Sequence, residues 1–218
     1  MIEEILPPGV AAAEAFGDTA PALLFPAEEA AIARAVAKRR SEFATGRACA
    51  RAALGKLGLP PVPIVPGPRG APQWPPGVTG SITHCAGYRA SAVARLADVA
   101  SLGLDAEPNA PLPDGVLERI AVAQERAWLP ELAAAVPGVS WDRLLFCAKE
   151  SVYKAWFPLT GRWLGFEQAA VTVEPQSRTF TARLLEPAEA RDGRRLAGFD
   201  GRWLVRDGLA LTAVTVPA

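Results

Sequence analysis

Apolar residues recur with a helical period in some parts of this chain and in short, strand-like runs in others. Residues 27–57 are rich in alanine and end at Gly58 and Pro60, which predicts a long helix. Residues 60–77 form a proline-rich loop. The rest of the chain contains runs typical of strands at 78–85, 88–96 and 99–107, helical stretches at 114–135 and 141–157, and strands at 166–175, 178–187 and 201–216. The last run turns at Asp207-Gly208, a strong hairpin signal.

A helix followed by a strand meander therefore occurs twice. This order predicts an α+β fold built from two similar halves, residues 1–102 and residues 103–218. No repeat is visible in the sequence itself, so the duplication is inferred from the order of the elements.

The second long helix contains charges in an apolar setting. On a helix, Leu145, Ala148, Val152 and Trp156 fall on one stripe, and the aromatic residues Phe146, Tyr153 and Phe157 fall on another. Glu150 and Lys154 lie one turn apart beside them. One interpretation is a surface ion pair worth a few tenths of a kcal/mol. The alternative follows from the missing polar face: charges that border apolar surface need partners elsewhere in the chain.

Composition excludes several classes of protein. The chain has 23 lysine and arginine residues and 23 aspartate and glutamate residues. The excess of basic charge expected of a nucleic-acid binder is therefore absent. The N-terminus is acidic and contains prolines, unlike a signal peptide, and no apolar run approaches the roughly 20 residues of a membrane span. Cys49, Cys85 and Cys147 are scattered, which excludes a disulfide framework and disfavours zinc. We expect a soluble, cytoplasmic protein that binds neither nucleic acid nor membrane.

Candidate chemistry begins with Asp105 and Glu107, at the end of an apolar run. In a strand, residues i and i+2 point to the same face about 6.5–7 Å apart. Two such carboxylates suit a hard cation such as Mg²⁺, and Glu150 offers a third. The alternative is a solvated acidic strand end.

Two further groups of residues attract attention. His84 is the only histidine, and it is either a packed or surface residue or part of a nucleophilic pair with Ser81 or Cys147, although no nucleophile elbow is present. The helix at 27–57 places Arg40, Arg47 and Arg51 on one stripe, with Lys38 and Arg39 beside it. This stripe, with Arg69, is either a solvated basic face or a clamp for a small anion, because arginine forks match phosphate oxygens.

Taken in order, the segments GPRGAPQWP, GSITHC, GLDAEP and FCAKESVYKAWF resemble the motifs of the 4'-phosphopantetheinyl transferases. The similarity is to the monomeric, two-half type of the actinobacterial branch, which serves nonribosomal peptide and polyketide synthases, and it covers nearly the whole chain. It implies a pseudo-twofold fold with coenzyme A between the halves. The implied reaction transfers 4'-phosphopantetheine from coenzyme A to a serine hydroxyl of acyl or peptidyl carrier domains and releases adenosine 3',5'-bisphosphate.

The resemblance also implies roles for individual residues. Asp105, Glu107 and Glu150 would hold Mg²⁺, or Mn²⁺ in its place, Glu150 would be the base, and Lys154 would contact the phosphates. Contacts to coenzyme A are implied for Thr83, His84, Arg39, Arg47, Arg51, Arg69, Gly70, Ala71 and Pro72, besides Asp105 and Lys154. Ala71 departs from relatives with a larger residue, which suggests a backbone contact. Glu125 matches an acidic position whose role varies within the family.

Two alternative functions stay open from sequence. The chain could be a carrier-protein or coenzyme A binding module that has lost turnover, or a Mg²⁺-dependent hydrolase of nucleotide pyrophosphates. The segment after the charged helix supplies Arg162, Trp163, Leu164 and Phe166. These residues either dock the acidic, apolar helix expected of carriers or merely pack the core and line the pantetheine channel.

Overall fold

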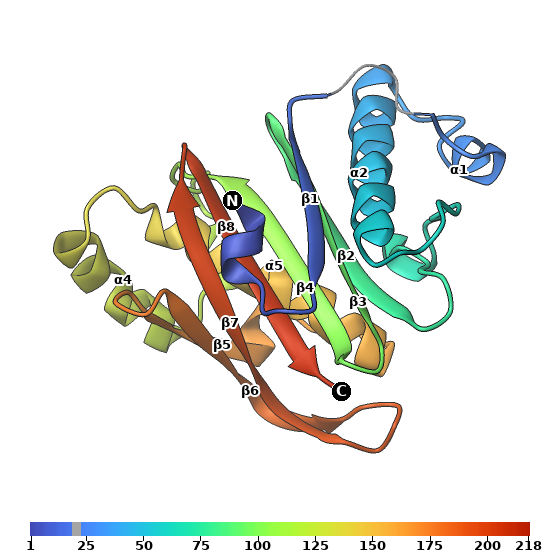
Figure 1. Cartoon of the computed structure of the whole chain (residues 1–218). Coiled ribbons are helices and arrows are strands. Elements are labelled where there is room, and N and C mark those ends of the chain that lie inside the picture. Colours follow the sequence, from blue (N-terminus) through green and yellow to red (C-terminus); the bar gives the residue numbers. More distant parts are fainter. Residues whose placement is uncertain (19–22) are drawn as a thin grey trace. The chain divides into compact units, whose positions relative to one another are not determined.

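The computed structural model describes residues 1–18 and 23–218 (Figure 1). The chain divides into two compact units, Met1–Leu102 with Pro217–Ala218, and Gly103–Val216. Strand β4, Val99–Pro108, begins in the first unit and ends in the second. Each unit combines helices with one antiparallel sheet, so the predicted α+β class is confirmed.

The first unit is a three-stranded antiparallel sheet with a long helix on it. The sheet has the order β1-β3-β2, from β1 (Ala11–Phe16), β2 (Val78–Cys85) and β3 (Tyr88–Arg95). Helix α2, Ala37–Lys56, runs alongside these strands in Figure 1. The small and apolar residues of α2 pack against the sheet. Ala50 and Leu54 of α2 and Val93 of β3 are completely buried in this core. Short helical turns lie at η1 (Ile2–Ile5), α1 (Pro26–Ala31) and η2 (Pro68–Gly70).

The predicted helix at 27–57 is interrupted in the structure. It forms α1 and α2, and the chain between them turns without any glycine or proline to signal it. The break lets the completely buried Glu28 accept hydrogen bonds from Arg51 and from the Ile64 amide, at 2.9 and 2.8 Å. Strand β1 was not predicted, because alanine-rich segments favour helices over strands. Glu14 of β1 instead binds the N-terminal amine and the Tyr88 hydroxyl, which fixes the strand beside β3.

The second unit is a five-stranded antiparallel sheet with the order β4-β8-β7-β6-β5. The strands are β5 (Ala169–Glu174), β6 (Thr179–Glu189), β7 (Arg195–Arg206) and β8 (Leu209–Pro217). The helices are α3 (Leu117–Ile120), α4 (Ala123–Ala135) and α5 (Trp141–Thr160), with the turn η3 at Phe166–Gln168. Asp207 and Gly208 both have positive φ, at 51° and 75°, so the predicted hairpin is confirmed.

Helix α5 lies directly against strand β4. A Cβ atom placed on Gly103 would stand 1.9 Å from the Ser151 carbonyl oxygen, so the two backbones are in contact at this point. Of the residues described, none belongs to a helix long and apolar enough to cross a membrane. The contact between β4 and α5 brings the acidic end of the strand next to the charged residues of the helix.

Candidate active site

Charged residues of β4 and α5 form two ion pairs in the second unit. On α5, Arg143, Glu150 and Lys154 follow one another at intervals of seven and four residues, which places them on one side of the helix. The Lys154 Nζ donates to Asp105 Oδ1 at 2.6 Å, and the Arg143 Nη1 donates to Glu107 Oε2 at 2.9 Å. The surface pair between Glu150 and Lys154 that the spacing allowed is therefore not formed, since Lys154 binds the strand.

Glu150 lies between these pairs and carries the remaining negative charge. Burial and the charge of Asp105 raise its pKa, and the nearby Lys154 offsets only part of this effect. The pKa of Glu107 is also raised, by burial and by Asp105. For Lys154, burial opposes the charged form, but the charge and hydrogen bond of Asp105 raise its pKa above the usual value. Three carboxylates and two cations leave the cluster with a formal charge of −1, which favours the approach of a cation.

The carboxylates of Asp105, Glu107 and Glu150 are chemically suited to bind a hard divalent cation. Carboxylate oxygens are the ligands that Mg²⁺ prefers, and burial, followed by repulsion from Asp105, raises the pKa values of Glu107 and Glu150. Within residues 1–18 and 23–218, however, no three His, Cys, Asp or Glu side chains are arranged to hold one ion. In the structure, Lys154 and Arg143 each bind one carboxylate of β4.

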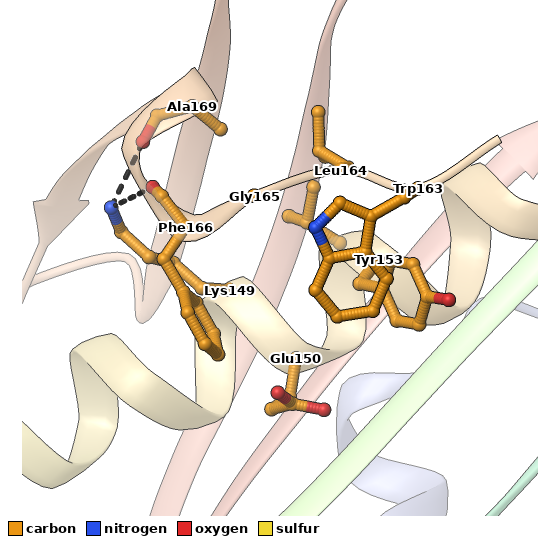
Figure 2. A pocket seen from close by; sticks show the side chains of 9 residues that line it. Lys149, Glu150, Tyr153, Trp163, Leu164, Gly165, Phe166 and Ala169 are labelled. Atoms are coloured by element: carbon orange, nitrogen blue, oxygen red, sulfur yellow. Dashed lines mark hydrogen bonds between the residues drawn. The ribbon is translucent and has the colours of Figure 1, made fainter. Parts of the chain in front are cut away.

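A pocket of about 230 Å³ opens beside Glu150. Figure 2 shows its wall, formed by one side of α5 and by the segment that follows the helix, with the Glu150 carboxylate pointing away from Lys149. The Tyr153 and Trp163 rings lie 4.8 Å apart at their centroids. The lining residues are Lys149, Glu150, Val152, Tyr153, Trp163, Leu164, Gly165, Phe166 and Ala169. This largely apolar pocket suits a thin, flexible chain with few charges.

Lys149 and Glu125 hold that wall in place. The Lys149 Nζ donates to the carbonyl oxygens of Phe166 and Ala169 at 2.7 and 3.0 Å (Figure 2). It also donates to the Ile120 carbonyl oxygen at 2.8 Å and forms an ion pair with Glu125 at 2.8 Å. Glu125 is completely buried and accepts hydrogen bonds from two backbone amides, one at the start of α4 and one in β5. Glu125 therefore connects α4, α5 and β5.

In the first unit, the structure brings Arg39 and His84 together. The Arg39 Nη1 lies 2.6 Å from the His84 Nε2, so it joins α2 to the end of β2. Thr83, the preceding residue, is buried. Both Arg39 and His84 are exposed, which leaves them accessible to an anionic ligand.

The other arginines of α2 have internal partners. Arg47 is 7% exposed, donates to the Ile64 carbonyl oxygen and lies 3.9 Å from the centroid of the Phe43 ring, and burial lowers its pKa to about 10. Arg51 binds Glu28, and Arg40 binds Glu29. The stripe of Arg40, Arg47 and Arg51 is therefore not a solvated basic face.

The loop that contains Arg69, Gly70, Ala71 and Pro72 is a tight turn in the first unit. It is closed by a hydrogen bond of 2.7 Å from the Gly67 amide to the Ala71 carbonyl oxygen. Arg69 and Gly70 both have positive φ, at 55° and 78°, and both are exposed.

A nucleophilic cysteine is excluded at Cys147. Its thiol is fully buried and donates to the Ala210 carbonyl oxygen, and burial raises its pKa well above the usual value. Because the thiolate is the reactive form, this residue serves the core. Ser81, the other candidate partner of His84, is also buried, with 4% of its surface exposed.

Sequence reasoning missed Arg143 altogether. Its signal is the spacing on α5, two turns before Glu150 and three turns before Lys154, combined with the position of Glu107 on β4. The partner of Lys149 was missed too, since residues 125 and 149 meet only in the folded chain.

Comparison with known proteins identifies the family of the chain. A family model described as the N-terminal domain of 4'-phosphopantetheinyl transferases matches residues 27–94, and one described as the 4'-phosphopantetheinyl transferase superfamily matches residues 101–203. The chain is 59% identical to the 4'-phosphopantetheinyl transferase Svp of Streptomyces mobaraensis, over all of this chain and 90% of the relative. It is 52% identical to Npt of Nocardia iowensis, over 98% of this chain and 99% of the relative. It is 48% identical to PptT of Mycobacterium tuberculosis, over 99% and 98% respectively. The chain therefore belongs to the 4'-phosphopantetheinyl transferase superfamily, whose members transfer phosphopantetheine from coenzyme A to carrier proteins.

Proposed function

We propose that the cluster of β4 and α5 carries out this transfer, with Asp105, Glu107 and Glu150 holding a Mg²⁺ or Mn²⁺ ion. The observation that supports the proposal is that Glu150 lies beside Asp105 and the cationic Lys154. Glu150 itself forms no ion pair in the described part of the chain. When bound, the cation would neutralise charge on the pyrophosphate of coenzyme A. The rest of the chemistry falls to the side chains of this unit.

Glu150 acts as the general base. The serine oxygen of the carrier attacks the phosphorus that bears the pantetheine arm, the bond from this phosphorus to the bridging oxygen breaks, and adenosine 3',5'-bisphosphate leaves. The hydroxyl proton passes to the Glu150 carboxylate, whose raised pKa makes it a stronger base than a solvated glutamate. Lys154 neutralises charge on the phosphate oxygens, which is where phosphoryl transfer needs most help.

The pocket beside Glu150 receives the pantetheine arm. Leu164 is 9% exposed and Phe166 is half-buried, so both line the pocket rather than the outer surface. Trp163, 56% exposed, and Arg162 remain candidates for contact with the carrier. For coenzyme A itself, Arg39 and His84 are the accessible pair for the 3'-phosphate. Thr83, Arg47, Arg51 and the loop from Arg69 to Pro72 are further proposed contacts, and in the structure Arg47 and Arg51 are engaged internally.

Mass spectrometry of a carrier domain tests the function directly. The purified protein, coenzyme A, Mg²⁺ and apo-carrier should give a carrier heavier by one phosphopantetheine group. Glu150→Gln should reduce the rate by about 10²–10⁴-fold, as expected for the loss of a general base. Glu174→Gln, on the exposed end of β5, is the matched control and should retain the parent rate.

The same experiment separates the alternatives. A hydrolase would consume coenzyme A and leave the carrier unmodified, and a binding module would leave both unchanged. A Glu150→Gln protein as active as the parent would contradict the proposed role of Glu150. The range of carriers modified would show whether nonribosomal peptide and polyketide carriers are both substrates. Action in the cytoplasm and a monomeric state stay predictions.

Arg162 tests the surface proposed for the carrier. Its guanidinium lies 5.4 Å from the centroid of the Trp156 ring and donates to the Glu189 carbonyl oxygen at 3.0 Å, so its charge is held in one place. Arg162→Glu should raise the KM for an acidic carrier and leave coenzyme A affinity intact. Arg202→Glu, an equal charge reversal on the exposed side of β7, is the control. An unchanged KM in Arg162→Glu would remove this residue from the docking surface.

A further inference from the structure

Arg143 is the most connected cation of the cluster, and the proposed chemistry leaves it without a role. Its Nη1 binds Glu107, its Nε donates to the Ala110 carbonyl oxygen at 3.0 Å, and its Nη2 donates to the Pro111 carbonyl oxygen at 2.9 Å. The side chain is 16% exposed. All three nitrogen atoms of the guanidinium therefore donate hydrogen bonds, so its position relative to Glu107 is fixed by geometry as well as by charge.

The neighbouring residue strengthens this attachment. Asp142 accepts a hydrogen bond of 2.8 Å from the Leu112 amide, so consecutive residues of α5 hold the chain that leaves β4. Removal of the charge on Arg143 would therefore leave part of the attachment in place.

Glu107 consequently has two possible charge partners, Arg143 and a cation. In the structure Arg143 holds it, and the three carboxylates are not arranged around a common point among the described residues. We propose that Arg143 is a positioning residue that competes with the divalent cation for Glu107 and so lowers the affinity of the coenzyme-free site for metal. The cation then binds well only together with the phosphates of coenzyme A, which supply further oxygen ligands. This inference rests on the proposed Mg²⁺ role of the cluster.

The size of the effect follows from the contact between Arg143 and Glu107. Glu107 must leave its charge-assisted hydrogen bond with Arg143 before it can bind the cation, and this competition should lower the metal-binding constant roughly tenfold. The interaction is screened by salt, so the effect should shrink as ionic strength rises. It should also require Glu107, because Arg143 acts through that carboxylate.

Electron paramagnetic resonance of free Mn²⁺ measures metal binding without any turnover. In the absence of coenzyme A, Arg143→Gln should bind Mn²⁺ about tenfold more tightly than the parent, whereas Arg143→Lys, which keeps the charge, should stay within about threefold. Arg202→Gln, on the exposed side of β7, controls for net charge and should match the parent. Arg143→Met, which keeps the aliphatic stem, is the second charge-free variant should Arg143→Gln prove unfolded by circular dichroism. Coenzyme A should enhance Mn²⁺ affinity less in the charge-free variants than in the parent.

Two results would overturn the inference. Unchanged or weaker Mn²⁺ binding in a folded charge-free variant would show that Arg143 does not compete with the cation. A tenfold gain that persists in the Glu107→Gln background would show that the effect does not pass through Glu107. Failure of the proposed function is distinguishable: the parent would then bind no Mn²⁺ even with coenzyme A, and would modify its carrier equally well in the presence of a chelator.

Discussion

The ion pair between Lys154 and Asp105 should contribute to folding as well as to catalysis. Lys154 Nζ lies 2.6 Å from Asp105 Oδ1, and the exposed fractions of the two side chains are 28% and 8%. Lys154→Met keeps the aliphatic stem and removes the charge, which leaves the Asp105 carboxylate buried without this counter-charge. Asp105→Asn removes the opposite charge at nearly constant volume.

The magnitude follows from the burial of the pair. Removal of one partner from a fully buried ion pair costs about 3–5 kcal/mol, and the partial exposure of Lys154 reduces this to roughly 1–3 kcal/mol. In a chain of this length, that loss corresponds to a decrease in Tm of about 2–12 °C. The double variant has neither charge, so it should be more stable than the sum of the single losses predicts, by about 1–3 kcal/mol.

Urea unfolding of the parent, both single variants and the double variant measures this coupling. Tryptophan fluorescence and far-ultraviolet circular dichroism must give coincident transitions, because the chain consists of two units and each free energy assumes a two-state process. Losses that add within about 0.5 kcal/mol would refute the reasoning, since independent sites behave in this way. In that case the short contact would carry no net stabilisation, and the role of Lys154 would be confined to catalysis.

Three further predictions concern other parts of the structure. Gly103→Ala should lower the free energy of unfolding by about 1–3 kcal/mol or more and reduce transfer, because its Cβ would stand 1.9 Å from the Ser151 carbonyl oxygen; a melt unchanged from the parent would contradict this contact. Of the three thiols, Cys85 should react first with a thiol reagent in the folded protein, because it is half-buried while the other two are buried and have raised pKa values; equal rates for all three would contradict the burial. Arg39→Gln should reduce the preference for coenzyme A over dephospho-coenzyme A, because a charge-assisted contact to the 3'-phosphate is worth about 1.5–3 kcal/mol. Calorimetry with both ligands measures this preference, and an equal preference in parent and variant would exclude Arg39 from the 3'-phosphate site.

Elements whose signals are local were predictable from the sequence. The hairpin at Asp207-Gly208 needs two residues with positive φ, and these two residue types adopt it readily. The strands at 78–85 and 99–107, and the helix that begins at residue 141, follow from runs of β-branched or periodic apolar residues. The absence of a broad polar face on that helix correctly indicated that Lys154 has a partner elsewhere in the chain, whereas Glu150 forms no ion pair within the described residues.

Features that depend on contacts between distant residues appeared only in the tertiary structure. The break between α1 and α2 exists because the buried Glu28 needs Arg51 and the Ile64 amide, and strand β1 exists because β3 offers it an edge. The partners of the charged residues on α5 have the same origin. Lys149 binds Glu125, Lys154 binds Asp105 and Arg143 binds Glu107, across 24 to 49 positions of sequence. A sequence pattern specifies which faces of a helix or strand are apolar. Which of several opposite charges a charged residue pairs with depends on the packing of β4 against α5, because this packing brings only some side chains within a few ångströms of one another.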